Sequence, residues 1–457
     1  MTSTERRSPA GSIFGADLRA ATLGILVLIT LAAFEGIGVA AALPTAARDL
    51  HGLAQYGWAF TGFLVANVVG LVVSGQVCDV RGPRSPLVAG VAGFVAGLTV
   101  SGTAVTMAQF VAGRVVQGIG SGLLITAVYV IIGERYPQSL RPKIFAAMSS
   151  AWVVPSLVGP VIAGALAQHA SWRWVFLGLV PFVLVGAALI AVALRSVRSR
   201  DAGRWLAQPS RVWRALGTAG AVAALEEVGQ NPRPATAVLG VGLAGLVWGM
   251  SGLLPPGTMS IRPGVAAPIA LRGLLAGAFF GVDSTVPLSL TVQHHFSATA
   301  AGLPLTASGV TWALGSWWQG RDASADRVRL VRAGFCCVAA AAALVAVISL
   351  PGVPGWLMYG GWGLAGIGAG LTISSCGVLV LAFTTDERRG ADTAALQLSD
   401  VVLSAITTGI AGVLLAAAAR AALGYTAAFV GFDVAMAALA AVGVAVAGRA
   451  RAPRGRP

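Results

Sequence analysis

Residues 113–124 read GRVVQGIGSGLL and place Arg114 inside an apolar segment that runs from about Met107 to Gly133. The segment is long enough to cross a bilayer as a helix. Because an arginine inside hydrocarbon costs at least a few kcal/mol, Arg114 needs a partner or a water-filled cavity. Glu35 lies in another apolar segment and is placed to be that partner. The alternative is that Arg114 extends to the nearer membrane surface, about seven residues away.

The composition is that of a polytopic membrane protein, with 56% hydrophobic residues, 11% charged residues and a mean hydropathy of +0.80. Lysine and arginine outnumber the acids by 31 to 17, but the arginines lie between apolar segments, so no nucleic-acid partner is expected. The only lysine, Lys143, precedes Ile144, which excludes a phosphate-binding Gly-x-x-x-x-Gly-Lys-Ser/Thr loop. The four cysteines show no Cys-x-x-Cys spacing, so neither a metal nor another cofactor is expected.

Apolar segments of about 20 residues or more predict fourteen transmembrane helices, in groups of six, two and six. The weakest segment is 215–229, which holds Glu226 and Glu227; without the hairpin 215–255 the count is twelve. We predict an all-α membrane protein with two six-helix bundles and a two-helix insertion between them. Its expected parts are a cytoplasmic N-tail 1–19, a first bundle 20–194, a cytoplasmic linker 195–214, the hairpin 215–255, a second bundle 268–447 and a basic cytoplasmic tail 448–457.

Lysines and arginines are divided unevenly between the two sides of the predicted membrane. With the N-terminus inside, 26 of them, Arg272 included, fall in cytoplasmic segments and 4 fall outside, while Arg114 lies within a span. Positive residues are retained in the cytoplasm, so both termini are expected there. The use of arginine in place of lysine and the abundance of alanine favour a bacterium with a GC-rich genome, and therefore its plasma (inner) membrane.

The two predicted bundles are related by an offset of 248 residues. Residues 118–123, GIGSGL, correspond to residues 366–371, GIGAGL, and Glu35 corresponds to Asp283. Glycines at this spacing give a helix a face along which a neighbouring backbone approaches closely. Two similar bundles with a binding site between them, near the middle of the membrane, are typical of secondary transporters.

Residues 75–84 read GQVCDVRGPR at the end of the second predicted span. This run, with Gly75, Asp79, Gly82 and Arg84, resembles the signature of the loop between spans 2 and 3 in the major facilitator superfamily. Its gating role in that family implies contacts that form in one global state and break in the other. The Asp79 carboxylate is expected to pair with a nearby arginine or to cap the N-terminus of a neighbouring helix.

Further motifs follow in the order of the same family. Arg114, Gln117 and the glycines after them resemble its span 4 signature, Arg-x-x-Gln-Gly-x-Gly. Residues 159–164, GPVIAG, resemble the span 5 motif of its proton-coupled exporters, although Ala163 replaces a glycine. Pro160 is expected to kink this span, and Gly159 and Gly164 are expected to allow close helix contact.

The first predicted span adds a resemblance to the fourteen-span drug/proton antiporters. These typically have Asp nine residues before a proline, and here Glu35 stands nine residues before Pro44. Glu35 and Arg114 lie at depths that differ by only about 3 Å at roughly 1.5 Å of rise per residue. In a low-dielectric cavity, desolvation raises a carboxyl pKa and a nearby arginine lowers it. Glu35 is therefore predicted to bind the coupling proton; a static structural pair is the alternative.

Other polar residues within spans are second candidates. Asp283 is predicted to take part in proton coupling, and Gln117, Asp400 and Gln397 are candidates for substrate binding, with interior polar pairing as the alternative. Trp312 is either a packing residue or part of a wall for a flat lipophilic substrate. Asp433 ranks lower.

The chain is thus predicted to be a proton-coupled exporter of lipophilic compounds, cations among them, that works by alternating access. A lipid or glycolipid exporter of the same fold is the alternative. An importer is disfavoured by the span 5 motif, and an enzyme or channel by the lack of a catalytic constellation or polar pore lining in the sequence. The expected partners are the bilayer, protons and the substrate, and a monomer is expected.

Overall fold

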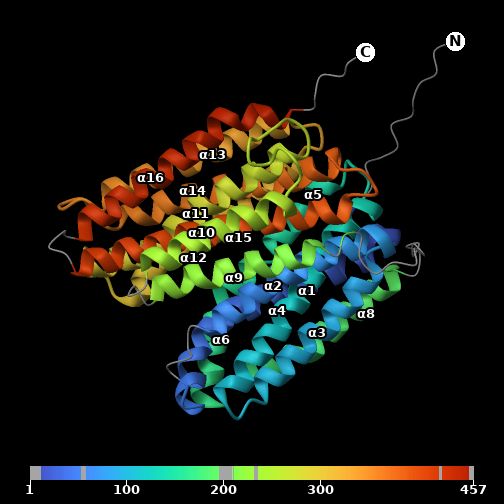
Figure 1. Ribbon diagram of the computed structural model, residues 1–457, viewed down its shortest axis with the longest axis horizontal. Coiled ribbons are helices and arrows are strands. Elements are labelled where there is room, and N and C mark those ends of the chain that lie inside the picture. Colours follow the sequence, from blue (N-terminus) through green and yellow to red (C-terminus); the bar gives the residue numbers. More distant parts are fainter. Residues whose placement is uncertain are drawn as a thin grey trace.

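The computed structural model describes residues 12–52, 58–194, 208, 210–230, 235–420 and 425–451. Within these ranges every regular element is a helix, and the helices form two bundles (Figure 1). A chain with so few charges forms helices because hydrocarbon offers no hydrogen-bond partners, so each segment satisfies its own backbone. The predicted all-α fold with two helical bundles is confirmed.

The first bundle comprises α1 (Ala16–Asp49), α2 (Trp58–Arg81), α3 (Arg84–Gly102), α4 (Met107–Arg135), α5 (Arg141–Ser150), α6 (Val153–His169), α7 (Trp174–Leu177) and α8 (Val180–Leu194). The fifth predicted span consists of two helices, α5 and α6, because the helix is interrupted at Ala151 and Trp152. The interruption precedes Pro160, and α6 continues through position 160, so the kink expected at this proline stays a prediction.

The second bundle comprises α11 (Ala266–Val292), α12 (Ala298–Arg321), α13 (Arg327–Ile348), α14 (Leu357–Phe383), α15 (Arg389–Arg420) and α16 (Tyr425–Val446), which a short 3-10 turn at Ala447–Ala450 follows. One helix in each bundle is held by the repeated glycines. Among residues 118–122 of α4, methyl groups on the first and third glycines would overlap the backbone of α2, and one on the second would overlap α3. Among residues 366–370 of α14, methyl groups on the first and third glycines would overlap the backbone of α12, and one on the second would overlap α13.

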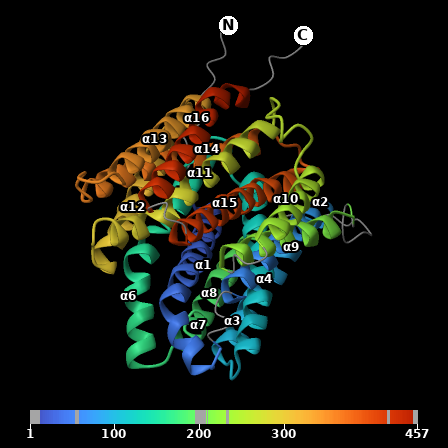
Figure 2. The ribbon, with the colours of Figure 1, turned by 60° about the vertical axis from the view of Figure 1, so that its left-hand side comes forward.

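A helical hairpin lies over the line where the bundles meet. It consists of α9 (Ser210–Gln230) and α10 (Ala235–Leu253), and α9 packs against both α2 of the first bundle and α15 of the second. Figure 1 shows α9 between these helices, and the turned view of Figure 2 keeps it beside α2 and α10. Most of the predicted linker 195–214 and the side chains of Glu226 and Glu227 lie outside the described residues.

The predicted count of fourteen spans is not confirmed. Eleven helices in the described part of the chain are long and apolar enough to cross a membrane, and α9, α10 and α12 are not among them. The apolar part of α10 is short, Gly240–Leu253. In α12, polar side chains such as Ser308, Ser316 and Gln319 are buried within the protein and lower the hydropathy of the helix.

The helices give the molecule two distinguishable ends. Thr22 near the start of α1 hydrogen bonds Tyr136 just after α4 (2.8 Å), so these helix ends lie together. We call this end, where α1 begins and α16 ends, the termini side (Figure 1). The opposite side carries the ends of α1 and α11 and the start of α4.

Candidate functional site

Glu35 and Arg114 form a buried ion pair inside the first bundle. The two side chains are 1% and 3% exposed, and Arg114 Nη1 donates to Glu35 Oε1. The guanidinium also donates from Nε to the Ala59 carbonyl of α2 (3.1 Å) and from Nη1 to Gln117 Oε1 of its own helix (2.8 Å). Its central carbon lies 4.4 Å from the centre of the Phe63 ring. Residues of α1, α2 and α4 therefore surround Arg114, and it does not extend to a membrane surface.

Proton occupancy of Glu35 changes the charge of this site. An ionised Glu35 balances the guanidinium, whereas a protonated Glu35 leaves a buried positive charge that is costly to keep uncompensated. Gln117 Nε2 is buried and has no hydrogen-bond partner among the described residues, so it can donate to a bound molecule. The predicted role of Gln117 in substrate binding stays a prediction.

Asp79 caps the N-terminus of α15 in the other bundle. Its Oδ1 accepts from the Gly390 N–H (2.6 Å) and its Oδ2 accepts from the Ala391 N–H (3.0 Å). A carboxylate at a helix N-terminus satisfies free N–H groups and interacts favourably with the helix dipole. An arginine or a helix N-terminus was expected as the partner of Asp79. The structure shows the helix N-terminus, and this contact joins the two bundles.

The other residues of this motif shape the crossing of α2 and α15. A methyl group on Gly75 would come within 2.7 Å of the Gly390 carbonyl oxygen, so only glycine permits this approach. Gly82 has φ of +81°, in the left-handed region that favours glycine, and it turns the chain out of α2. Arg84 is exposed at the start of α3. The gating role predicted for this motif stays a prediction.

Further hydrogen bonds join the bundles in the half of the molecule nearer the termini side. Arg141 Nη1 donates to the Leu381 carbonyl (2.8 Å), and Gln319 Nε2 donates to the Pro142 carbonyl (3.0 Å). Among the residues that the structure describes, the hydrogen bonds between the first and second bundles lie in this half. The two bundles are thus joined at the termini side.

Arg272 organises a second buried ion pair that sequence reasoning missed. Arg272 was counted among the cytoplasmic charges, but it lies inside α11 and is 5% exposed. Its Nε donates to the Asp400 carboxylate (2.7 and 2.9 Å) and its Nη2 to Gln397 Oε1 (2.9 Å). Its Nη1 donates to the Tyr129 hydroxyl of α4 (3.3 Å), across the two bundles. The signal for Arg272 was the one used for Arg114: an arginine within an apolar run.

Asp283 of α11 pairs with an aromatic residue instead of an arginine. Its Oδ1 accepts from Trp362 Nε1 of α14 (2.7 Å), and Trp362 stacks on Phe279. Trp312 packs edge-on against Phe279, with ring centroids 5.3 Å apart, so the structure brings Asp283 and Trp312 into one aromatic cluster. Asp433 of α16 is also buried. Its carboxylate oxygens have no hydrogen-bond partner among the described residues.

The span 5 motif makes a different contact from the one expected. A methyl group on Gly164 would meet nothing within 4 Å, so this glycine does not allow a close helix approach here. Helix α1 comes close to α6 at Gly38, where an added methyl group would lie 3.4 Å from the Ala163 side chain. Gly159 is buried, and the side chain of Pro160 lies outside the described set. The small residue that replaces the family's glycine therefore provides the helix contact.

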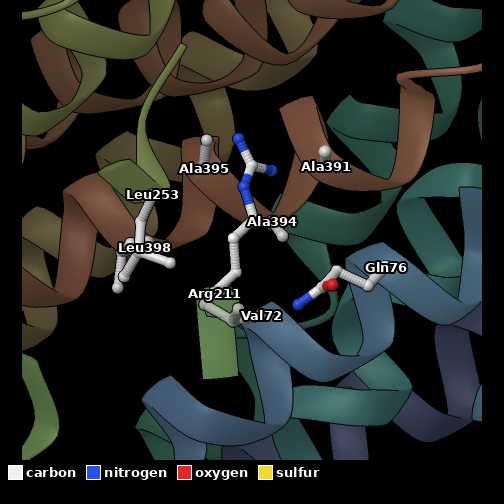
Figure 3. A pocket seen from close by; sticks show the side chains of 8 residues that line it. All are labelled: Val72, Gln76, Arg211, Leu253, Ala391, Ala394, Ala395 and Leu398. Atoms are coloured by element: carbon white, nitrogen blue, oxygen red, sulfur yellow. The ribbon is translucent and has the colours of Figure 1, made fainter. Parts of the chain in front are cut away.

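The hairpin contributes a positive charge to the junction of the bundles. Arg211 of α9 lines a small cavity with Gln76 of α2 and Ala394 of α15 (Figure 3). Gln76 Oε1 accepts from the backbone N–H of Gln208 (2.8 Å), while its Nε2 has no hydrogen-bond partner among the described residues. This cavity lies apart from the Glu35 and Asp283 sites.

Comparison with known proteins agrees with the bundles and motifs. The sequence model of the family described as Major Facilitator Superfamily matches residues 23–349. This chain belongs to the Major Facilitator Superfamily. Among solved members of that fold, the human organic anion transporter MFSD10 superposes with a TM-score of 0.69 over 94% of this chain and 99% of its own, at 13% identity. A bacterial homologue of ferroportin in an outward-facing state superposes with a TM-score of 0.68, covering 94% of this chain and 98% of its own, at 12% identity.

The curated relatives of this superfamily member include efflux proteins. A protein of Mycobacterium tuberculosis named "Probable multidrug-efflux transporter" is 29% identical over 423 residues, which cover 88% of each chain. The "MFS efflux transporter aclA" of Aspergillus oryzae is 32% identical over 164 residues, 36% of this chain and 29% of its own. The chain therefore aligns with about a third of the length of such fungal relatives. The chain is a multi-pass membrane protein of a family of transporters, not of enzymes.

Proposed function

We propose that this chain exports lipophilic compounds, cations among them, in exchange for protons. The observation that carries the proposal is the buried Glu35–Arg114 pair, an acid and a base in contact inside one bundle of a two-bundle transporter. Intramembrane ionisable residues that pair with each other mark proton and ion pathways. The match with a relative named as a multidrug-efflux transporter, along 88% of both chains, supports export.

Helix α2 connects the proposed proton site to the contact between the bundles. Arg114 donates to the Ala59 carbonyl near the start of α2, and Asp79 near its end caps α15. A protonated Glu35 leaves the Arg114 charge unbalanced, which favours a rearrangement of α2 and weakens the cap. Proton binding thereby biases the choice between two arrangements of the bundles, which is the condition for coupling between distant sites.

We assign the termini side to the cytoplasm of a bacterial plasma (inner) membrane, on the distribution of lysine and arginine. With the bundles joined at that side, the molecule adopts the outward-facing state. Glu35 takes a proton from outside, the contacts at the cytoplasmic side open, and the substrate binds as the proton is released inside. The chain acts as a monomer, because one chain holds both bundles and the site between them.

Transport by purified protein in liposomes tests this function. When the lumen of the liposomes is acidic, the wild-type protein should accumulate radiolabelled tetraphenylphosphonium in the lumen, because protons leave the lumen as the compound enters it. Glu35→Gln should abolish accumulation driven by the gradient, because its side chain does not titrate, while exchange of the compound without a gradient continues. Asp17→Asn is the matched control, since Asp17 is an exposed acid on the same helix.

Either of two results would contradict the proposal. Absence of gradient-driven accumulation by the wild-type protein would overturn proton-coupled export of this compound class. Unchanged accumulation by the Glu35→Gln variant would remove Glu35 as the coupling site.

A further inference from the structure

The Asp283–Trp362 pair occupies the positions that the Glu35–Arg114 pair occupies in the first bundle. The offset of 248 residues that relates Glu35 to Asp283 also relates Arg114 to Trp362. Each pair is separated by 79 residues, and in each a side-chain N–H donates to the carboxylate. The two bundles thus hold the same contact between corresponding helices. They differ in the donor, which is a guanidinium in one bundle and an indole in the other.

This exchange of donors leaves the second acid without a cation. The Arg114 guanidinium supplies a full positive charge to Glu35, whereas the Trp362 indole supplies one hydrogen bond and no charge. Among the described residues, no ion pair involves Asp283. An ionised carboxylate in such a place is costly unless a positive charge lies beside it. A cation from outside the chain can fill this need at Asp283 but not at Glu35.

The rings around Asp283 suit an aromatic cation. Phe279 stacks on Trp362 with ring centroids 5.1 Å apart, and Trp312 meets Phe279 edge-on at 5.3 Å. Phe280 lies 6.1 Å from Trp312. Ring faces attract cations, and Trp does so most strongly. Neighbouring rings also provide apolar area for a lipophilic body. The acid and the rings therefore recognise charge and shape at one place.

Part of the cluster is accessible. Asp283, Phe280 and Trp312 are half-buried, whereas Phe279 and Trp362 are buried behind them. These residues belong to α11, α12 and α14. Helices α12 and α14 also pack against α5 of the first bundle, and α11 reaches α4 through the Arg272 contact. The half-buried members thus offer a surface that a bound molecule can contact, on helices of which each also reaches the first bundle.

We propose that Asp283, with Phe280, Trp312 and the buried Trp362, binds the transported compound, and that this compound carries a positive charge on an aromatic body. This inference rests on the proposed export function and assigns different ligands to the two halves. The acid with a resident arginine binds the proton, and the acid with a resident tryptophan binds the substrate cation. Proton and substrate then occupy separate sites and are coupled through the movement of the bundles.

Binding of two ions of the same shape and opposite charge tests the assignment. Full-length protein in detergent is titrated with tetraphenylphosphonium and, separately, with tetraphenylborate, and the Kd is measured by equilibrium dialysis. The wild-type protein should bind the phosphonium ion and bind the borate at least about tenfold more weakly, because Asp283 favours positive charge. Asp283→Asn should raise the Kd of the phosphonium ion by about tenfold or more. Equal binding of both ions, or an unchanged Kd in this variant, would overturn the proposal.

Two further variants separate this inference from the proposed function and from loss of folding. Trp362→Arg supplies the second bundle with its own cation, so it should weaken binding of the phosphonium ion. An unfolding temperature equal to that of the wild type would show that the weaker binding does not come from loss of folding. Asp17→Asn should leave the Kd unchanged, because Asp17 is an exposed acid that belongs to neither buried pair. If Asp283→Asn binds normally while Glu35→Gln loses proton-driven transport, this inference fails and the proposed function stands. If the binding results agree with these expectations but no proton gradient drives transport, the proposed function fails and the assignment of Asp283 to cation binding stands.

Discussion

Arg114 is positioned by groups other than Glu35. The Ala59 carbonyl and the Gln117 side chain accept from the guanidinium, so Glu35 is not its only partner. Under the proposed coupling, protonation of Glu35 removes the counter-ion of Arg114 but neither of these two neutral acceptors. Lysine could not replace this arginine, because a single ammonium group does not reproduce the planar fork of donors.

Replacing Arg114 with alanine should therefore lower stability markedly. The change leaves Glu35 buried without its partner, and loss of one member of a buried pair costs about 3–5 kcal/mol. Adding Glu35→Gln to the Arg114→Ala variant should recover part of this loss. Thermal unfolding in detergent measures both variants. If the double variant is as unstable as the sum of the two single variants, the residues are not coupled.

Asp49 provides a pH-dependent contact at the opposite side, beyond the apolar part of α1. Its Oδ2 accepts from Trp172 Nε1 (2.9 Å) and from Arg173 Nη1 (3.0 Å). The hydrogen bond from Trp172, and then that from Arg173, holds the pKa of Asp49 below its ordinary value of 3.8. The carboxylate is therefore favoured in the folded state. Its contribution is present above pH 3.8 and is lost as the pH falls through the lower, folded-state pKa.

Asp49→Ala should consequently lower the unfolding temperature at pH 7 but not at a pH below the folded-state pKa. The side chain is 52% exposed, so the effect should be about 1 kcal/mol or less. Unfolding temperatures of the variant and the wild type, measured from about pH 7 down to about pH 2, give the comparison. Asp49→Asn retains an acceptor for Trp172 and should show a smaller difference. A difference that grows on acidification would contradict this assignment.

At the scale of helices, the glycines of α4 and α14 set how closely the core of each bundle packs. Each stripe meets two neighbouring helices at their backbones, one on either side. Van der Waals contact between backbones replaces the hydrophobic effect as the source of helix association in a bilayer. Side chains at these positions would separate the helices and displace Trp362 and Arg114 with them.

Gly366→Ala should destabilise the protein, whereas Gly360→Ala on the same helix should not. A methyl group on Gly366 would overlap the Ser308 carbonyl of α12, while one on Gly360 would meet nothing within 4 Å. Alanine is the better helix former by about 1 kcal/mol, so the Gly360 variant is expected to be neutral or slightly more stable. The measurement is the unfolding temperature of each of the two variants in detergent, compared with that of the wild type. Equal effects of the two substitutions would show that α14 is not in close contact with α12.

At the scale of the whole molecule, the junction of the bundles holds a native reporter. Cys78 is 1% exposed and lies next to Asp79, and its side chain packs close to Gly390 of α15. The joined state therefore protects this thiol, and separation of the bundles at the termini side uncovers it. Because Cys336 is exposed and Cys337 is partly exposed, both are replaced by serine, and the remaining buried Cys376 is distinguished from Cys78 by the labelled peptide.

Asp79→Asn should increase the rate at which a maleimide labels Cys78 in that background. The amide carries no charge for the α15 dipole and accepts with one oxygen instead of two, which weakens the cap by about 1 kcal/mol. A loss of that size corresponds to roughly a fivefold rise in the separated population. The labelling rate, followed by mass spectrometry, is the measurement, and Asp17→Asn is the control. An unchanged rate would mean that Asp79 does not hold the joined state.

The Glu35–Arg114 pair and the helix cap by Asp79 could be predicted from the sequence, whereas contacts that depend on how the helices and bundles dock could not. The contact of Glu35 with Arg114 was expected from helix rise and depth. The contact of Arg272 with Tyr129 depends on how the bundles dock, which no local pattern records. The contact of Trp362 with Asp283 could not be predicted from pairs of opposite charge, because an indole carries no charge. The open space at Gly164 likewise depends on where α6 lies relative to its neighbours.

Helix α9 rests on one helix from each bundle, so it lies across a moving joint. When the bundles rock, α9 can travel with α2 or with α15, and its packing on the other must slide and re-form in every cycle. We therefore expect the hairpin to slow the movement of the bundles, and with it the turnover, without setting the direction of transport.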